Sequence, residues 1–162
     1  MQPTPEGVAM LQGKEPLSLT PALGSHEAVS RFAATCGRHV KDAQAYRPTF
    51  RALGFQHVLQ GTSIFENLEV WSQPGGHPML ELDTADGTTL CRMSFQSKSS
   101  EDYTAALDRY ISDQYGPNRL ARETTSTGTN WAGQSDGFIM YETESVDSPT
   151  HGKIRTVLVY FE

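Results

Sequence analysis

The chain lacks any apolar run near the ~18 residues that a membrane-spanning helix requires, so its 162 residues predict no membrane span. It lacks a cationic N-terminal segment followed by an apolar one, so the sequence predicts no signal peptide. Positive charge is also scarce, because 13 Lys and Arg residues face 19 Asp and Glu residues and leave a net charge of −6. Proteins that bind nucleic acid usually present a basic face, so we expect neither DNA nor RNA as a partner.

The sequence also lacks the residue spacings that are typical of catalytic, metal or phosphate sites. Its 5 histidines are scattered, and none forms a close pair that would place two imidazoles on one metal ion. Cys36 and His39 offer a thiol and an imidazole on one side of an expected helix. The cysteine lies on an apolar stripe, however, which favours a structural role. We therefore predict no catalytic residue, no metal ligand and no cofactor.

Acidic residues gather near two of the expected hairpins, as Glu81, Asp83 and Asp86 and as Glu142, Glu144 and Asp147. Carboxylates in such clusters can serve acid–base or calcium chemistry. Their alternation along a strand is also typical of a solvated outer face. We favour the solvated face.

Cysteine is rare, and the two cysteines lie on different kinds of apolar pattern. Cys36 shares helical spacing with Phe32 and Val40, whereas Cys91 alternates with Met93 along a strand. We therefore predict that Cys36 and Cys91 face each other across a helix–sheet interface and can form a disulfide. A bonded pair indicates an extracytoplasmic location, periplasmic or secreted, and two buried thiols indicate the cytoplasm.

Residues 1–24 are rich in proline and glycine and have neither helical nor strand periodicity. We interpret them as an extended N-terminal arm in front of a single domain over residues 25–162. Leu11, Leu17 and Leu19 give this arm apolar side chains to bury. They are our candidate contacts to a partner protein.

The apolar periodicity predicts two helices, each followed by a group of strands. The first helix is expected from an N-cap at Ser25 to about residue 45, followed by a short segment that Gly54 closes. The second is expected to begin at Ser99, with Asp102 at the capping-box distance from it, and to end at Gly116. The expected strands cover residues 55–60, 64–71, 79–84, 88–97, 119–125, a short piece around 131, 137–144 and 154–161.

Short links between the strands favour antiparallel pairing, and an Asp86-Gly87 pair is a strong hairpin signal. The predicted fold is therefore a two-layer α+β domain. Its antiparallel sheet has six to eight strands, and its two main helices cover one face. The repeated order of a helix and then strands suggests two structural halves of one plan.

Trp131 lies in a polar, glycine-flanked stretch, and we expect it to be exposed as a further partner contact. The absent motifs, the acidic surface and the arm favour a non-enzymatic protein-binding or assembly module, an accessory protein of bacterial type. The alternative is a small enzyme or ligand carrier whose site is assembled from separated residues across the sheet. A pocket lined by ionisable groups with shifted pKa values favours that alternative, and an apolar patch favours binding.

Overall fold

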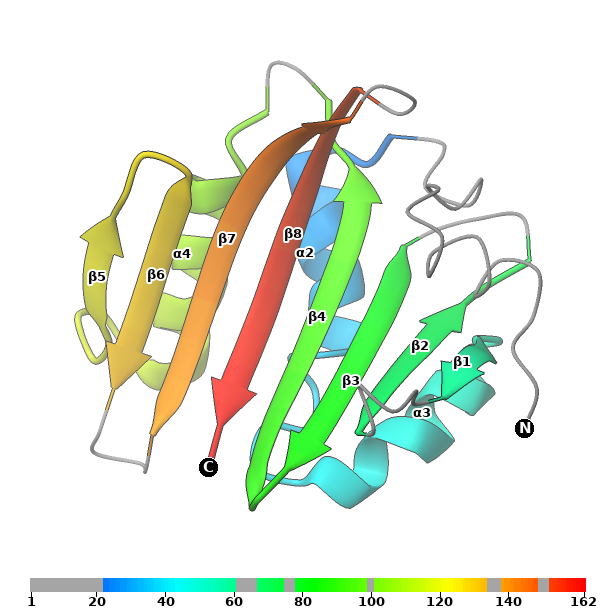
Figure 1. Ribbon diagram of the computed structural model, residues 1–162. Coiled ribbons are helices and arrows are strands. Elements are labelled where there is room, and N and C mark those ends of the chain that lie inside the picture. Colours follow the sequence, from blue (N-terminus) through cyan, green and yellow to red (C-terminus); the bar gives the residue numbers. More distant parts are fainter. Residues whose placement is uncertain (1–21, 61–66, 75–77, 99–100, 134–137, 149–151) are drawn as a thin grey trace.

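The computed structural model describes residues 22–60, 67–74, 78–98, 101–133, 138–148 and 152–162. One antiparallel sheet of eight strands carries its helices on a single face (Figure 1), which confirms the predicted α+β class. No helix in these residues is long and apolar enough to cross a membrane.

The elements follow one another in two groups. The first consists of α2 (Ser25–Ala34), the 3-10 turn η2 (Ala43–Ala45), α3 (Tyr46–Ala52), β1 (Gln56–Gln60), β2 (Leu68–Ser72), β3 (Met79–Ala85) and β4 (Thr88–Gln96). The second consists of α4 (Tyr103–Tyr115), β5 (Ala121–Thr124), β6 (Gly128–Gly133), β7 (Ile139–Ser148) and β8 (Gly152–Phe161).

The strand order β1-β2-β3-β4-β8-β7-β6-β5 makes the two groups mirror each other about the β4–β8 pair. Each group is a helix followed by a four-stranded meander that runs between the centre and one edge of the sheet. This arrangement agrees with two structural halves of one plan, while α3 has no counterpart in the second half. Residues far apart in the sequence therefore meet at the β4–β8 pair, where Thr89 lies opposite Phe161 and Gln96 opposite Ile154.

Turn chemistry places several boundaries where the sequence predicts them. Asp86 and Gly87 both have positive φ, 51° and 80°, as a two-residue hairpin of the type I′ class requires. Gly54 has φ of 90° and ends the segment that contains α3. Pro48 fits within the first turn of α3, where its missing amide proton has no helical acceptor. Helix α4 begins later than predicted, at Tyr103 and not near residue 99: Asp102 is its N-cap and accepts a hydrogen bond from the amide of Ala105 at 2.9 Å.

The first helix is shorter than predicted, because α2 ends at Ala34 and not near residue 45. Thr35 leaves the helical conformation, and its hydroxyl donates to the carbonyl of Arg31 at 2.8 Å. Gly37 then passes so close to α4 that a Cβ there would lie 2.4 Å from the Tyr110 hydroxyl oxygen. This close approach bends the chain after Thr35, and Cys36 therefore lies in a turn and not within a helix.

The expected N-cap of α2 is also displaced by one residue. Gly24 is the N-cap, and Ser25 is the first helical residue. The Ser25 hydroxyl instead donates to the Glu101 carboxylate at 2.8 Å. The side chain therefore joins the start of α2 to the segment that precedes α4.

The core lies between the helices and the sheet, on the faces that the sequence predicts. Phe32 of α2 and Leu107 of α4 are fully buried. They belong to one cluster with strand residues of both halves, including Met93, Phe95, Val157 and Val159. Ile111 is buried in the same cluster, and Val40 is partly buried against it.

Leu23, assigned to the arm by its sequence context, belongs to this core. Its side chain is 2% exposed. Its amide donates to the carbonyl of Gln96 at 2.9 Å, and its carbonyl accepts from the Tyr103 hydroxyl. Residues 1–21, with Leu11, Leu17 and Leu19, lie outside the described residues.

Candidate functional site

Side chains alternate between two faces along each strand of the sheet. Cys91, Met93 and Val159 belong to the core under the helices. The intervening residues, such as Arg92 and Leu158, therefore lie on the opposite face, which we call the open face. Figure 1 shows this face toward the viewer with α2 and α4 behind the sheet, and no helix of the described residues covers it. Val58, Val70, Met79 and Ile154 nevertheless form a buried cluster on its β1–β3 side and at Ile154 of β8.

The two acidic clusters of the sequence meet on the open face. Register pairs carry one row of side chains across six strands: Glu81, Arg92, Leu158, Glu142, Asn130 and Glu123. Asp83 lies two residues after Glu81 on β3, and Glu144 lies two residues after Glu142 on β7. Because residues two apart on a strand share a face, both side chains also lie on the open face. Among the described strand residues, Arg92 is the one cation that the alternation places on this face.

Other cations are directed to the helix side of the sheet. The Arg155 guanidinium lies over the Tyr103 ring, 5.0 Å from its centroid. The Arg122 guanidinium lies 3.7 Å from the Asp108 carboxylate of α4. Charge is therefore largely segregated between the two faces of the sheet, with the carboxylates of β3, β5 and β7 named above on the open one.

Arg92 lies between the two carboxylate clusters and does not neutralise them. A terminal guanidinium nitrogen of Arg92 is 3.7 Å from the Glu81 carboxylate. The pKa of Glu81 is nevertheless raised, mainly by burial, with Arg92 opposing the shift and Asp83 adding to it. The pKa of Glu142 is raised to about 7, first by a hydrogen bond shared with Glu144, then by burial and by the Glu144 charge, against the pull of Arg92.

An apolar row runs beside the charged one. Leu90 lies opposite Tyr160, and Tyr160 lies opposite Met140. The Phe138 ring packs edge-on against Tyr160, with ring centroids 5.4 Å apart and planes at 78°. These four side chains are half-buried. We use the name open-face patch for the charged side chains of this face together with the four apolar ones: Glu81, Asp83, Arg92, Glu123, Glu142 and Glu144 with Leu90, Phe138, Met140 and Tyr160.

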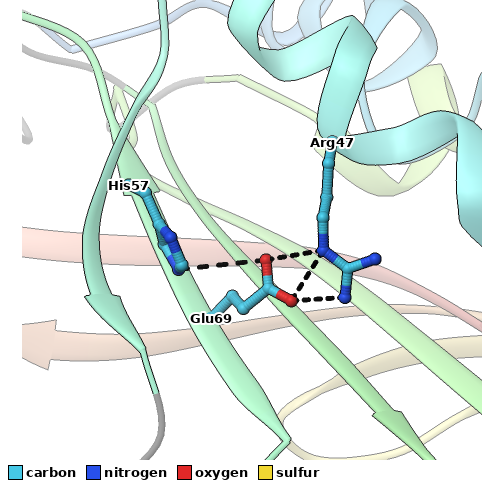
Figure 2. A network of polar contacts seen from close by, with 3 residues as sticks. All are labelled: Arg47, His57 and Glu69. Atoms are coloured by element: carbon cyan, nitrogen blue, oxygen red, sulfur yellow. Dashed lines mark hydrogen bonds and ion pairs between the residues drawn. The ribbon is translucent and has the colours of Figure 1, made fainter. Parts of the chain in front are cut away.

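A second polar cluster lies on the helix side, and Figure 2 shows how its side chains converge from three elements. Glu69 of β2 is buried, and both of its carboxylate oxygens accept hydrogen bonds from the Arg47 guanidinium of α3, at 2.8 and 3.0 Å from Nε. His57 of β1 points at the same carboxylate, with Nε2 3.8 Å from Oε1. The His57 ring also stacks on Trp71, with centroids 4.6 Å apart and planes at 11°.

We interpret this second cluster as a structural contact that holds α3 against the sheet. The hydrogen bond to Glu69 raises the pKa of Arg47, because the carboxylate stabilises the charged guanidinium. Arg47 also lines a cavity of about 350 Å³ beside the β3–β4 hairpin, but neither Glu69 nor His57 lines it. The buried carboxylate is therefore held by the protein's own guanidinium and does not face that cavity.

Cys36 and Cys91 face each other across the interface between the turn after α2 and strand β4. Their sulfur atoms lie at disulfide distance, 2.11 Å, and their Cα atoms are 5.3 Å apart. The predicted juxtaposition is confirmed. The Tyr46 hydroxyl donates to the Cys36 carbonyl at 2.7 Å and helps to hold this turn against the sheet.

The expectation that Trp131 is exposed is wrong. Its side chain is 2% exposed, and its indole nitrogen donates to the Asp108 carboxylate of α4 at 2.8 Å. The glycines around it mark tight packing and not a flexible stretch. A Cβ at Gly128 would lie 1.6 Å from the carbonyl oxygen of Thr143, and one at Gly133 would lie 2.3 Å from the Leu120 side chain.

The remaining candidates do not assemble into a reactive centre in the part of the chain that the structure describes. His39 contacts the Thr49 hydroxyl at 2.6 Å, and Cys36 is held by Cys91. Within the described residues, no group of three or more His, Cys, Asp or Glu side chains is placed to hold a metal ion. A groove of about 420 Å³ lies between α2 and α4, lined by small side chains such as Ala33 and by the ionisable side chains of His26, Asp102, Arg109 and Asp113.

Neither acidic cluster of the sequence, taken alone, indicates the open-face patch. Glu81 and Glu142 are brought to one row by the pairing of β4 with β8, and no local pattern predicts that pairing. The fold and the patch together define a single-sheet α+β domain with one sheet face that carries most of the strand carboxylates. Comparison of the chain with protein-family models, with curated proteins and with solved structures finds no match.

Proposed function

We propose that the chain is a non-enzymatic protein-binding module and that the open-face patch receives its partner. The observation that carries the proposal is the combination of an apolar row with an excess of carboxylates on a sheet face that no helix of the described residues covers. Half-buried aromatic and aliphatic side chains such as Tyr160 and Met140 are the residues that gain most from exclusion of water at an interface. The charges beside them favour one kind of partner over another.

A photo-reactive amino acid at two positions tests this proposal. One variant carries it at Tyr160 on the open face, and the other at His26, an exposed residue of α2 that lines the groove between the helices. We expect a protein of the native host to be cross-linked through position 160. That protein, once purified, is then titrated with unmodified chain and with variants.

The purified partner should bind Tyr160→Asp at least about tenfold more weakly than the unmodified chain, because an interfacial aromatic side chain commonly contributes more than 1.4 kcal/mol. His26→Asp should bind as the unmodified chain does. Cross-linking through position 26 together with unchanged affinity of Tyr160→Asp would overturn the proposal.

We further propose that the protein works as an accessory module outside the cytoplasm, in the periplasm or as a secreted protein. The support is the disulfide distance between Cys36 and Cys91, since such bonds persist in oxidising compartments. Fractionation of the native host, with the protein detected by antibody in each compartment, tests this location. Detection in the cytoplasmic fraction with two reduced thiols would contradict it.

A small acid–base enzyme or ligand carrier is the second candidate function. It is favoured by the Glu142–Glu144 pair, because a carboxyl with a pKa of about 7 is suited to proton transfer near neutral pH. A screen of hydrolase substrates and small ligands, repeated with Glu142→Gln, tests it. A turnover or a ligand-induced rise in melting temperature that Glu142→Gln abolishes would establish this function in place of the first.

A further inference from the structure

We infer that the partner of the open-face patch presents a basic amphipathic segment, one in which Lys or Arg side chains stand beside apolar ones. This inference rests on the proposed protein-binding function. It concerns the charge and polarity of the partner segment, and it can be wrong even if the chain does bind a protein through this patch. The alternatives on the same face, a neutral apolar partner or a cation without apolar contact, are outcomes of the test.

The charge balance of the patch selects positive partners. Carboxylates of three strands, β3, β5 and β7, share the one guanidinium of Arg92, which already lies 3.7 Å from Glu81. The helix side of the sheet holds other cations in its own contacts, such as Arg122 with Asp108 and Arg155 over Tyr103. The excess negative charge on the open face is therefore not balanced from within the described residues, and a basic partner complements it.

The geometry selects a partner that is also apolar. Glu142 lies two residues from Met140 on β7, and Arg92 lies two residues from Leu90 on β4. The charged row and the apolar row therefore run about 7 Å apart along the strands. Glu81 and Glu142 are separated by strands β4 and β8, which places the two carboxylate clusters about 14 Å apart across the sheet. A short segment with cations and apolar side chains along its length spans both rows.

Three synthetic peptides of equal length provide the probe. The first contains Lys and Leu, the second contains Glu and Leu in the same order, and the third contains Lys and Ser. Binding to the full chain is measured by calorimetry, and the binding face is mapped by amide chemical shifts. We expect the Lys/Leu peptide to bind at least about tenfold more tightly than either control. Shifts should be centred on β4, β8 and β7, and affinity should fall with added salt.

Charge-reversed variants locate the selectivity. Glu81→Lys and Glu142→Lys should each weaken the Lys/Leu peptide by about tenfold. Asp113→Lys is the matched control, because it makes the same charge change on an exposed side chain of α4, and it should leave binding unchanged. Glu142→Gln, which only removes charge, should give a smaller loss and covers the case in which a reversal fails to fold.

The outcomes separate this inference from the proposed function. Equal binding of the Lys/Leu and Glu/Leu peptides, or a loss at Asp113→Lys equal to that at Glu142→Lys, overturns the basic partner. Tight binding of the Lys/Ser peptide overturns the amphipathic requirement. The proposed function fails separately, if the cross-linked natural partner is insensitive to Tyr160→Asp.

Discussion

Reduction of a disulfide between Cys36 and Cys91 should destabilise the fold by an amount that depends on the length of the loop that the bond closes. Both cysteines are completely buried, and they are 55 residues apart in the sequence. In the chain-entropy account, a bond that closes a loop of this size stabilises the folded state by about 4 kcal/mol, because it restricts the unfolded chain. We therefore expect the free energy of unfolding of the oxidised protein to exceed that of the reduced protein by about 4 kcal/mol.

Urea titration of the unmodified chain with and without dithiothreitol measures this difference through far-ultraviolet circular dichroism. The slope of the free energy against urea should also increase on reduction, since the unfolded chain then exposes more surface. The paired variant Cys36→Ala with Cys91→Ala is the control, because it carries no thiol and should be indifferent to reductant.

Thiol counting decides whether the bond exists. The count is made in denaturant without reductant, because the buried sulfur atoms are shielded from reagent in the folded state. Two reactive thiols per chain would refute the disulfide. A bonded protein whose stability changes by less than about 1 kcal/mol on reduction would refute the entropic reasoning.

Phe32→Ala and Leu107→Ala should each lower the free energy of unfolding by about 2–5 kcal/mol, because both side chains are fully buried. The stability of the unmodified chain should fall as pH rises from about 4.5 to about 7, because folded Glu142 holds its proton more tightly than the unfolded chain does. Glu142→Gln should flatten that fall, as urea unfolding across the same pH range measures. Deletion of residues 1–21 should leave the cooperative melt unchanged, whereas extending the deletion through Leu23 should lower the melting temperature, as calorimetry detects.

Each of these expectations has a control or a contradicting result. Val146→Ala, at a side chain that is 59% exposed, should change stability by less than about 0.5 kcal/mol. If Val146→Ala lowered the free energy of unfolding as much as Phe32→Ala does, the buried face of the helix would be misassigned. Stability that rises between pH 4.5 and 7 in a manner that Glu142→Gln abolishes would reverse the sign of the linkage. An unfolded chain after deletion of residues 1–21 would make that segment part of the core.

Local patterns predicted most of the elements, because strands, hairpins and caps depend on nearby residues. The alternation through Cys91 and Met93 and the Asp86-Gly87 turn are both present where the sequence indicates them. The failures occur where a distant residue decides the local conformation. Helix α2 ends early because Gly37 packs against Tyr110 of α4, a contact that a single sequence does not reveal.

The same distinction applies to the candidate site. Each acidic cluster could be found from the sequence, and each alone is typical of a solvated strand face. Their meeting depends on the register of β8 against β4 and β7, where Leu158 lies opposite both Arg92 and Glu142. Trp131 was misjudged for a related reason, because the packing of Gly128 against the Thr143 carbonyl is a contact between strands.

Proton release offers a last test that connects the charges of the patch to its function. In the free protein, Glu142 titrates near pH 7 because it shares a proton with Glu144 on a partly desolvated face, while Arg92 alone opposes the shift. A bound Lys or Arg side chain would favour the ionised carboxylate and lower that pKa. Binding of the Lys/Leu peptide at pH 7 should therefore release protons, and affinity should increase as pH rises through about 7.

Calorimetry in buffers with different ionisation enthalpies measures that release directly. Asp83 and Glu81 also face the site, and burial raises the pKa of Glu81 as well, so part of the release should persist in Glu142→Gln. Asp113→Lys, on the helix side, should leave the release unchanged. Proton uptake on binding, or a release that is the same in the unmodified chain and in Glu142→Gln, would show that the carboxylates of the open face do not meet the partner's cations.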